Sequence, residues 1–391
     1  MTVVRAEWQA ARAAAREAGR SLRGPDESVA LVDAVGRTLA VELRSLARVP
    51  GFDAAALDGW AVRGEGPWPL GAPIVAGPVS AGETPLAAGT ARPITTGAAV
   101  PDGTDRVLRS ESGLVVDGLL TAAAEPPLPP RHIRRAGEEA EAGDPLFDAG
   151  TLLTPPRVAV AAVCGRDSVP VAPLPRVALA VLGDEVVGEG VPSVGTVRDV
   201  FSVQVPRLLA SLGADPVSSA RVPDDLDATR AALDRPDVSL VVTTGGTAHS
   251  STDHIREALA GLGADLVVEG VAMRPGQPLL LARRGDTLYL CLPGNPMAAL
   301  VCLVMVGVPL IEGLLGRRAA PPGLVTLAVD VPHPRSGVLV QAYRATAGGA
   351  VPTARQSSAM LRGLADADGL LVVPEGGARA GEAVPSVTLP W

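Results

Sequence analysis

The sequence predicts a multidomain chain that combines an α/β unit, built on a parallel sheet, with β-rich segments. Its 391 residues are too many for one hydrophobic core, so two to four domains are expected. From about residue 175, apolar runs of strand length alternate with helical segments, which is typical of a parallel sheet with helices on both faces. Between residues 45 and 142, and again from about 320, short apolar runs separated by Gly/Pro turns indicate strands.

The composition limits the classes of protein that fit. Hydrophobic residues make up 47% of the chain and charged residues 19%, as expected of a globular protein. The net charge of −8 argues against a nucleic-acid partner, because phosphate backbones are bound by basic surfaces. A small anionic ligand is still compatible with this net charge, because its binding depends on the hydrogen-bond donors close to it and not on the charge of the whole chain. The three cysteines are odd in number and widely spaced, which predicts free buried thiols and a cytoplasmic location.

The N-terminal residues are predicted to be helical. Residues 2–20 alternate Arg and Glu with Ala, which predicts an amphipathic helix and lacks the apolar core of a signal peptide. A second helix is expected from about Pro25, because acidic residues follow this proline in what would be the first turn. The longest apolar stretch, 298–315, contains Glu312, and we interpret it as a buried helix and not a membrane span.

Three turns are predicted to share one edge of the α/β sheet. The strands expected at 176–182, 238–243 and 287–292 are followed by "GDEVVGEG", "TGGTAHSSTD" and "LPGNP". In a parallel sheet these turns lie together beyond the carboxyl ends of the strands, where ligands bind. Past the sheet, the tail from 320 predicts a small β-barrel or sandwich.

The turn with the double glycine is the first candidate ligand site. Gly245 and Gly246 permit positive φ and a close backbone approach, so their N–H groups could bind an oxyanion. The turn lacks the Gly-Lys-[Ser/Thr] ending of a phosphate-binding Walker loop. The alternative is a tight structural turn in which Thr252 or Asp253 caps the next helix.

Acidic and basic residues near the same edge are the next candidates. Asp184 and Glu185 are adjacent acids that either bind Mg²⁺ or belong to a solvated loop, and Asp253 could join them. His249 and His254 are interpreted as surface histidines, because zinc needs further ligands that the sequence does not place nearby. Arg274, in "MRPGQP", suits bidentate binding of an oxyanion.

Taken together, these motifs resemble the molybdopterin molybdenumtransferase family, which includes MoeA and the gephyrin E-domain. The resemblance extends over nearly the whole chain, in the family's order. The motifs are "PGFDAAALDGWAV", "PITTGAAVPDGTDRV", "RRAGEEAEAGD", "LGDEVV", "TGGTAHSSTD", "MRPGQP", "LPGNP" and "QSSAMLRGLADADGLLVVPE". Eight motifs in order make this resemblance specific.

The resemblance implies a four-domain layout and a two-fold homodimer. A linking domain with the N-terminal helices would comprise 1–44 and 143–174, and a β-rich insertion would comprise 45–142. The α/β molybdopterin- and nucleotide-binding domain would comprise 175–319, and a C-terminal β-barrel 320–391. Family members take adenylylated molybdopterin and molybdate as substrates, cleave the adenylate with a divalent cation, expected to be Mg²⁺, insert molybdate at the dithiolene and release AMP.

The resemblance also assigns site residues by matching position. The insertion, contributed by the partner subunit, would supply Asp58, Thr96 and Glu139, and the tail would supply Ser358 near the molybdate. Asp253, Asp58 and Glu185 are the expected catalytic residues. Asp184, Glu185, Asp253 and Glu139 are the expected metal ligands. The expected substrate-binding residues are Thr96, Asp184, Gly245, Gly246, Thr247, Arg274, Gly276, Pro293, Gly294, Asn295 and Ser358.

The chain departs from the family within these motifs. Ala55 replaces a serine, Phe201 an asparagine, Gln277 a lysine, and Asp368 stands where the family has asparagine. A charge-assisted hydrogen bond is worth about 1.5–3 kcal/mol and a neutral one about 0.5–1.5 kcal/mol, so the loss of a lysine at Gln277 should weaken anion binding about tenfold. Two alternatives follow: a relative repurposed for another nucleotide-type substrate in a specialised pathway, and a non-catalytic dimeric scaffold.

Overall fold

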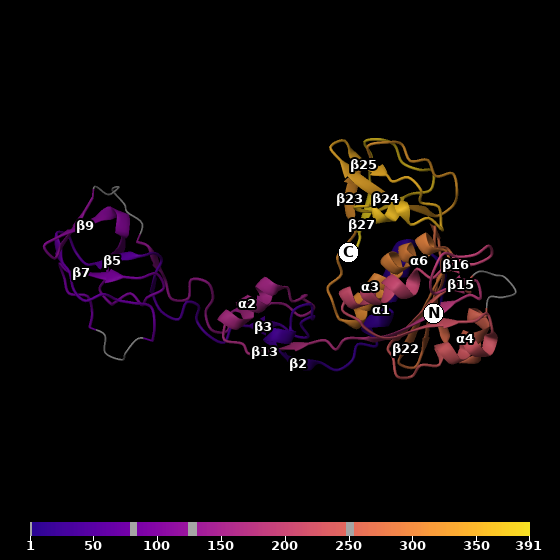
Figure 1. Ribbon diagram of the computed structural model, residues 1–391, viewed down its shortest axis with the longest axis horizontal. Helices are drawn as coiled ribbons and strands as arrows, with labels where there is room; N and C mark the ends of the chain where they lie inside the picture. Colours follow the sequence, from indigo (N-terminus) through magenta and orange to yellow (C-terminus); the bar gives the residue numbers. More distant parts are fainter. Residues whose placement is uncertain (1, 79–83, 124–130, 248–253) are drawn as a thin grey trace.

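The computed structural model describes residues 2–78, 84–123, 131–247 and 254–391. Its parts lie along one long axis (Figure 1). The β-rich insertion occupies one end, a small linking part containing α2 (Pro155–Val163) lies in the middle, and the α/β unit with the C-terminal β unit occupies the other end. The insertion is therefore held away from the α/β sheet of its own chain.

Seven of the described strands form one sheet, in the order β1-β19-β21-β22-β18-β14-β17. Neighbouring strands run parallel except at β21, which is antiparallel to both β19 and β22. The predicted parallel sheet is confirmed, with one antiparallel strand added. The strands are β1 (Val3–Ala6), β14 (Arg176–Leu182), β17 (Asp215–Val222), β18 (Leu240–Thr244), β19 (Asp265–Val271), β21 (Leu280–Arg284) and β22 (Thr287–Leu292).

Helices cover both faces of this sheet. Side chains alternate along β14, so Val177 and Leu179 pack on the face of α1, α3, α6 and α7, while Ala178 and Ala180 pack on the face of α4 and α5. This double covering explains why the central strands are continuous apolar runs. The helices are α1 (Trp8–Arg20), α3 (Phe201–Ser211), α4 (Leu226–Leu233), α5 (Ile255–Gly261), α6 (Pro296–Cys302) and α7 (Val308–Leu314).

The predicted buried apolar helix is confirmed. α6 and α7 are joined by a π-helical turn, η3 (Leu303–Gly307), into one long helix. By length and composition this helix could cross a membrane, but 89% of its apolar window is buried inside the protein. It forms the centre of the main core, and α1 packs closely on it, because a Cβ at Gly313 would lie 2.1 Å from the carbonyl oxygen of Arg16.

Two expectations for the N-terminus are wrong. Residues 3–6 form β1 and not the first turn of a helix, because their backbone pairs with β19. The helix expected from Pro25 is also absent from this described stretch: residues 27–30 form β2 and residues 31–33 a 3₁₀ turn, η1 (Leu31–Asp33). β2 (Glu27–Ala30) pairs with β13 (Ser168–Val171), a partner about 140 residues away that local propensity cannot reveal.

The linking and insertion parts are built from short strand pairs, as expected for 45–142. β3 (Leu43–Arg44) pairs with β12 (Pro145–Phe147), and β4 (Ala54–Ala55) pairs with β11 (Ile133–Arg134). The insertion adds two small sheets and the 3₁₀ turn η2 (Ser110–Ser112). Their strands are β5 (Gly59–Val62), β6 (Trp68–Pro69), β7 (Ala91–Ile94), β8 (Arg106–Arg109), β9 (Gly113–Val116) and β10 (Leu119–Ala122).

The C-terminal unit is a sheet that is antiparallel except for the short β20, which runs parallel to β24, and it is consistent with the expected small barrel. Its described strands follow the order β20-β24-β26-β27-β23, and β25 pairs with β24. A bridge between Leu327 and Ala350 brings the β23 edge back to β25. The elements are β20 (Met273–Arg274), β23 (Gly323–Thr326), β24 (Val338–Thr346), β25 (Gly349–Pro352), β26 (Gly369–Val373), β27 (Ala383–Thr388) and α8 (Arg362–Ala365). The domain boundaries given above stay a prediction.

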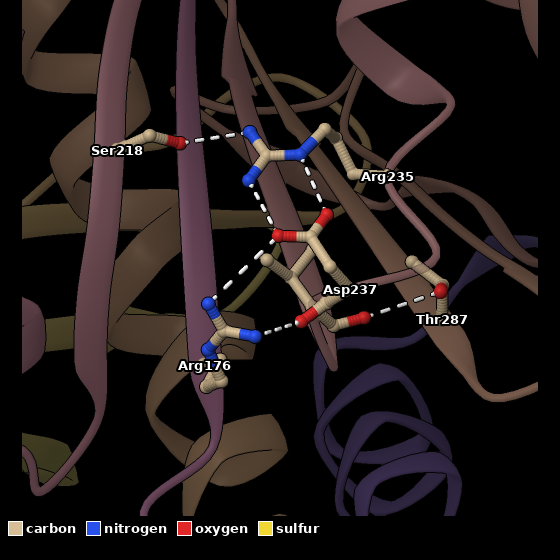
Figure 2. Close-up of polar contacts among 6 residues, drawn as sticks. Arg176, Ser218, Arg235, Asp237 and Thr287 are labelled. Atoms are coloured by element: carbon tan, nitrogen blue, oxygen red, sulfur yellow. Dashed lines mark hydrogen bonds and ion pairs between the residues drawn. The ribbon is translucent and has the colours of Figure 1, made fainter.

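A polar network fastens the amino ends of the α/β strands (Figure 2). Arg235 donates to both carboxylate oxygens of Asp237, at 2.8 and 2.9 Å, and to the Ser218 hydroxyl at 2.9 Å. Arg176 donates to the Asp237 carbonyl oxygen at 2.7 Å, and Thr287 donates to the Val238 carbonyl oxygen at 3.2 Å. These bonds connect β14, β17, β18 and β22 near their amino ends, whereas the turns predicted to bind ligand follow the carboxyl ends of the strands.

Asp237→Asn should lower the thermal unfolding midpoint in a pH-dependent way. The hydrogen bonds from Arg235 hold the pKa of Asp237 at about 2, below its ordinary value of 3.8. A carboxyl with a lower pKa in the folded state stabilises fully above pH 3.8 and loses this contribution as the pH falls toward 2. Calorimetry should therefore show a gap between wild type and variant that narrows between pH 4 and 2. The exposed Asp227→Asn is the control, and a gap that does not change with pH would contradict the role of the carboxylate.

Candidate nucleotide and oxyanion site

The three strand-end turns meet at one edge of the sheet, as predicted. β14 lies next to β18, and β18 lies next to β22, all parallel, so their carboxyl ends are adjacent. The turns that begin at Gly183, Gly245 and Pro293 line one cavity of about 560 Å³. A second cavity of about 860 Å³ adjoins it, since Pro278, Pro293 and Asn295 line both. The candidate site is thus a pair of adjoining cavities.

Gly245, which follows β18, contacts the carboxyl ends of both neighbouring strands, β14 and β22. Its backbone has φ +91°, and a Cβ there would lie 2.7 Å from the carbonyl oxygen of Leu182 at the end of β14. Its N–H donates to the carbonyl oxygen of Leu292 at 3.1 Å, at the end of β22. That N–H is therefore engaged within the protein. In the described part of the chain, the N–H of Gly246 (φ +63°) has no such acceptor and can face an oxyanion.

The acids of the first cavity differ from the expected set. Glu185 lines the cavity as predicted, but Asp184 turns toward Asp224. The Asp184 N–H donates to the Asp224 carboxylate at 3.4 Å, and the Asp224 N–H donates to the Asp184 carboxylate at 3.3 Å. Asp224, which sequence reasoning missed, lines the cavity instead. Its position follows β17 by only two residues, so it belongs to the same edge of the sheet.

Arg198 is a second residue that the sequence did not single out. It lies on β16 (Val197–Arg198), which pairs with β15 (Val186–Val187) next to the first cavity. Its Nη1 atom is buried, and among the described residues it has no hydrogen-bond partner. An unpaired buried guanidinium N–H costs free energy, so a ligand oxygen is the natural acceptor. Arg198 supplies the cation that the lysine-free glycine turn lacks.

The second cavity is rich in arginine. It contains the predicted Arg274, Gly276 and Ser358, together with Gln277. The Nε atom of Arg274 is buried, without a partner in the described residues. The sequence had not indicated three further arginines of the lining, Arg5, Arg256 and Arg335. Because Arg256 pairs with Glu269 at 2.7 Å, the remaining positive charge is concentrated on Arg5, Arg274 and Arg335.

The C-terminal unit contributes one wall of this cavity. The Ser358 carbonyl oxygen accepts the Ala298 N–H at 3.1 Å, which fixes the loop before α8 against the start of α6. Asp368 does not line either cavity among the described residues. Its carboxylate accepts the Ala345 N–H at 2.7 Å and braces β24, so it leaves the charge of the cavity unaffected.

The insertion residues form a separate group. Asp58 accepts hydrogen bonds from the backbone N–H and the hydroxyl of Thr96, at 2.7 and 2.8 Å. These bonds, the backbone one above all, lower the pKa of Asp58, so the carboxylate stays ionised. Asp58, Thr96 and Glu139 are exposed. Asp58 and Thr96 adjoin the insertion strands β5 and β7, which lie at the end of the molecule away from the α/β unit (Figure 1), whereas Ala140, next to Glu139, packs with Val160 of α2 in the linking part. The predicted site is therefore not assembled within one chain.

Part of the expected set lies outside the described residues, namely Asp253 with Thr252 and His249. Thr247 is described and buried at the edge of the first cavity, and Gly294 and Asn295 lie in its wall. Within the described ranges, no group of three or more His, Cys, Asp or Glu residues is placed to hold a metal ion. Glu185 and Asp224 are nevertheless suitable oxygen donors at the same cavity.

An α/β unit with two adjoining cavities lined by carboxylates and arginines, combined with a β-rich insertion and a C-terminal β unit, indicates a multidomain enzyme with a candidate site for an anionic small molecule. Three family models match the chain in order. They are the MoeA N-terminal region (domain I and II) at 6–165, the probable molybdopterin binding domain at 178–313, and the MoeA C-terminal region (domain IV) at 326–389.

Relatives and solved structures agree with these models. The chain is 31% identical to molybdopterin molybdenumtransferase 2 of Mycobacterium tuberculosis (strain H37Rv), covering 89% of this chain and 91% of the relative. It is 32% identical to the Bacillus subtilis molybdopterin molybdenumtransferase, covering 90% and 87%. A molybdopterin biosynthesis MoeA structure from Pyrococcus horikoshii is similar with a TM-score of 0.74 and 26% identity, covering 96% and 98%. The chain belongs to the molybdopterin molybdenumtransferase (MoeA) family.

Gly245→Ala should destabilise the fold and weaken nucleotide binding. A side chain at φ +91° with a Cβ 2.7 Å from a backbone oxygen costs about 2 kcal/mol or more, unless the strand ends separate. The matched control is Gly323→Ala, on β23 outside both cavities, whose Cβ would make an ordinary 3.9 Å contact with the Ser386 carbonyl oxygen. Urea unfolding and AMP titration should distinguish the two variants, and equal behaviour would contradict the role of Gly245.

Arg198→Met should reduce AMP affinity about tenfold, because it removes a charge-assisted hydrogen bond while keeping most of the side-chain volume. Arg207→Met, on the exposed side of α3, removes the same charge outside the cavity and is the control. Calorimetric titration with AMP measures both. A Kd for Arg198→Met within twofold of that of Arg207→Met would exclude phosphate binding by Arg198.

Proposed function

We propose that this protein is a molybdopterin molybdenumtransferase of molybdenum cofactor biosynthesis. It would bind adenylylated molybdopterin, cleave the adenylate with release of AMP, and transfer molybdate to the dithiolene. The observation that supports this proposal most directly is the pair of adjoining cavities, one suited to a nucleotide phosphate and the other to an oxyanion. The names of the relatives favour this function over a repurposed enzyme or a scaffold.

The first cavity would bind the phosphate side of the substrate. The Gly246 N–H and the Arg198 guanidinium are donors, and Gly245 lets the backbone approach closely. Phe201 and Val200 give the same cavity an apolar wall suited to a base or a pterin ring. Anion donors and a flat apolar surface are what a nucleotide linked to a pterin requires.

Mg²⁺ fits the acids of this cavity. Mg²⁺ is bound in proteins by one or two carboxylates, and substrate phosphates and water complete its coordination. Glu185 and Asp224 would provide these carboxylates, with Asp253 as a further ligand or a base. When bound, Mg²⁺ would neutralise the charge that develops on the phosphate during cleavage. Asp184 would position Asp224 through their mutual backbone hydrogen bonds.

The second cavity would bind molybdate. Arg274 and Arg335 present guanidinium groups and Ser358 a hydroxyl to the same space, a donor set that matches a tetrahedral dianion. Because Pro278, Pro293 and Asn295 line both cavities, the oxyanion would be bound next to the substrate held in the first cavity. Such proximity is the main contribution an enzyme can make to joining two bound reactants.

A homodimer in the cytoplasm would complete the site. The insertion strands β5 and β7, which Asp58 and Thr96 adjoin, lie at the opposite end of the molecule from the α/β unit of their own chain (Figure 1). In a two-fold dimer the insertion of one subunit can close the cavities of the other. The Thr96 hydrogen bonds keep Asp58 ionised and fixed, as a group that meets Mg²⁺ or the leaving phosphate should be.

AMP release from adenylylated molybdopterin tests this function. Wild type with Mg²⁺ should release AMP, and molybdate should stimulate the release. Glu185→Gln and Asp253→Ala should each lower the rate at least 100-fold, while the exposed Asp227→Asn leaves it unchanged. Chromatography of AMP and light scattering of the dimer are the measurements. A folded dimer that releases no AMP would overturn the proposed function.

A further inference from the structure

Arg5 is a charged residue that belongs to none of the sequence motifs, and it lines the second cavity, in which molybdate is proposed to bind. It lies on β1, at the edge of the seven-stranded sheet. It lines the 860 Å³ cavity with Arg274 and Gln277, and it meets the same two residues again in an adjoining cavity of about 310 Å³. The N-terminal strand therefore places a guanidinium beside the "RPGQP" turn, from a position more than 260 residues away in the sequence.

The backbone of Arg5 is held in an unfavourable conformation. Its φ is +46°, in the left-handed region that residues with a Cβ rarely adopt. The flanking residues are fixed by pairing with β19, Val4 opposite Glu269 and Ala6 opposite Val271. Gly270, which lies between those two partners, has φ +78° and lines the same cavity as Arg5, and a Cβ there would lie 3.1 Å from the Gln277 carbonyl oxygen. Conformations of this kind persist where the surrounding structure imposes them, and they are concentrated at ligand sites.

The positive charge of Arg5 is available to a ligand. The nearest acid of the cavity wall, Glu269, is engaged by Arg256 at 2.7 Å. Among the described residues, Arg5 makes no ion pair or side-chain hydrogen bond of its own. Arg274 and Arg335 likewise have no acidic partner within the described ranges. Three guanidinium groups thus converge on a cavity of a chain whose net charge is −8.

We infer that Arg5 binds the oxyanion substrate and supplies the positive charge that the neutral Gln277 does not. Gln277 can donate a neutral amide hydrogen bond, whereas a dianion is bound more strongly by a charged donor. Arg5 and Gln277 line the same two cavities, so both residues border the space in which the anion would bind. This inference rests on the proposed function, and it assigns to the N-terminal strand a binding residue for molybdate.

The experiment compares three variants by calorimetric titration with molybdate alone. Arg5→Gly removes the guanidinium and suits a positive φ, so the thermal midpoint should stay the same or rise. Its molybdate Kd should increase about fivefold, a value scaled to the exposed position of Arg5. Arg5→Lys should bind nearly as well as wild type. Arg20→Gly, on the exposed side of α1, removes the same charge outside the cavity and should leave the Kd unchanged.

A rescue variant tests the link to Gln277. Gln277→Lys in the Arg5→Gly background should restore molybdate affinity to the wild-type value or better, because the lysine returns a cation to the same cavity. A Kd for Arg5→Gly equal to that of Arg20→Gly would overturn the inference. A loss of affinity that Gln277→Lys does not restore would also overturn it, because Arg5 would then act elsewhere.

The inference and the proposed function can fail separately. Molybdate-stimulated AMP release by wild type, with a molybdate half-saturation that Arg5→Gly does not change, would preserve the function and remove the role of Arg5. Absence of AMP release together with molybdate binding that depends on Arg5 would preserve the anion site and remove the proposed reaction. Wild type that neither releases AMP nor binds molybdate would overturn both.

Discussion

The contact of Gly245 with the ends of its two neighbouring strands is the constraint on which both cavities depend. Its missing side chain admits the Leu182 carbonyl, and its N–H fixes the Leu292 carbonyl. The turns after β14, β18 and β22 are therefore held at fixed separations, and the walls of the cavities are extensions of those turns. The polar network of Arg235 and Asp237 joins the same strands at their amino ends. The central strands are therefore held together at both of their ends.

The fold separates charge between the two cavities. Carboxylates belong to the first, where Glu185 and Asp224 follow β14 and β17. Guanidinium groups dominate the second, which lies between β1, β20 and the C-terminal unit. In the second cavity the acid Glu269 pairs with Arg256, which leaves the other arginines there without an acidic partner among the described residues. In the first cavity the guanidinium of Arg198 adds one cation beside the two carboxylates. A cation and an oxyanion can then be bound side by side in a chain that is acidic overall.

Sequence reasoning succeeded where one local pattern determines structure. The strands 176–182 and 287–292 are apolar runs bounded by charges and turns, and their predicted bounds are the observed ones. It failed where a distant partner decides, as at β2, whose helix-like start is overruled by pairing with β13. Glu185 and the glycine turn were predicted because they belong to motifs. Arg198 and Arg335 were missed, because a lone arginine has no local signature and its role depends on which elements the fold brings together.

The replacement of a lysine by Gln277 illustrates how a site can keep its charge while the sequence motif loses it. The turn that bears Gln277 is one wall of the cavity, and β1 is another, so a cation can enter the same space from either. The position of a cation on the turn is set by the conformation of the turn, whereas the position of a cation on β1 is set by the pairing of β1 with β19. Anion binding in this chain is thereby coupled to the attachment of its N-terminal strand, which an isolated α/β unit starting at residue 175 would lack.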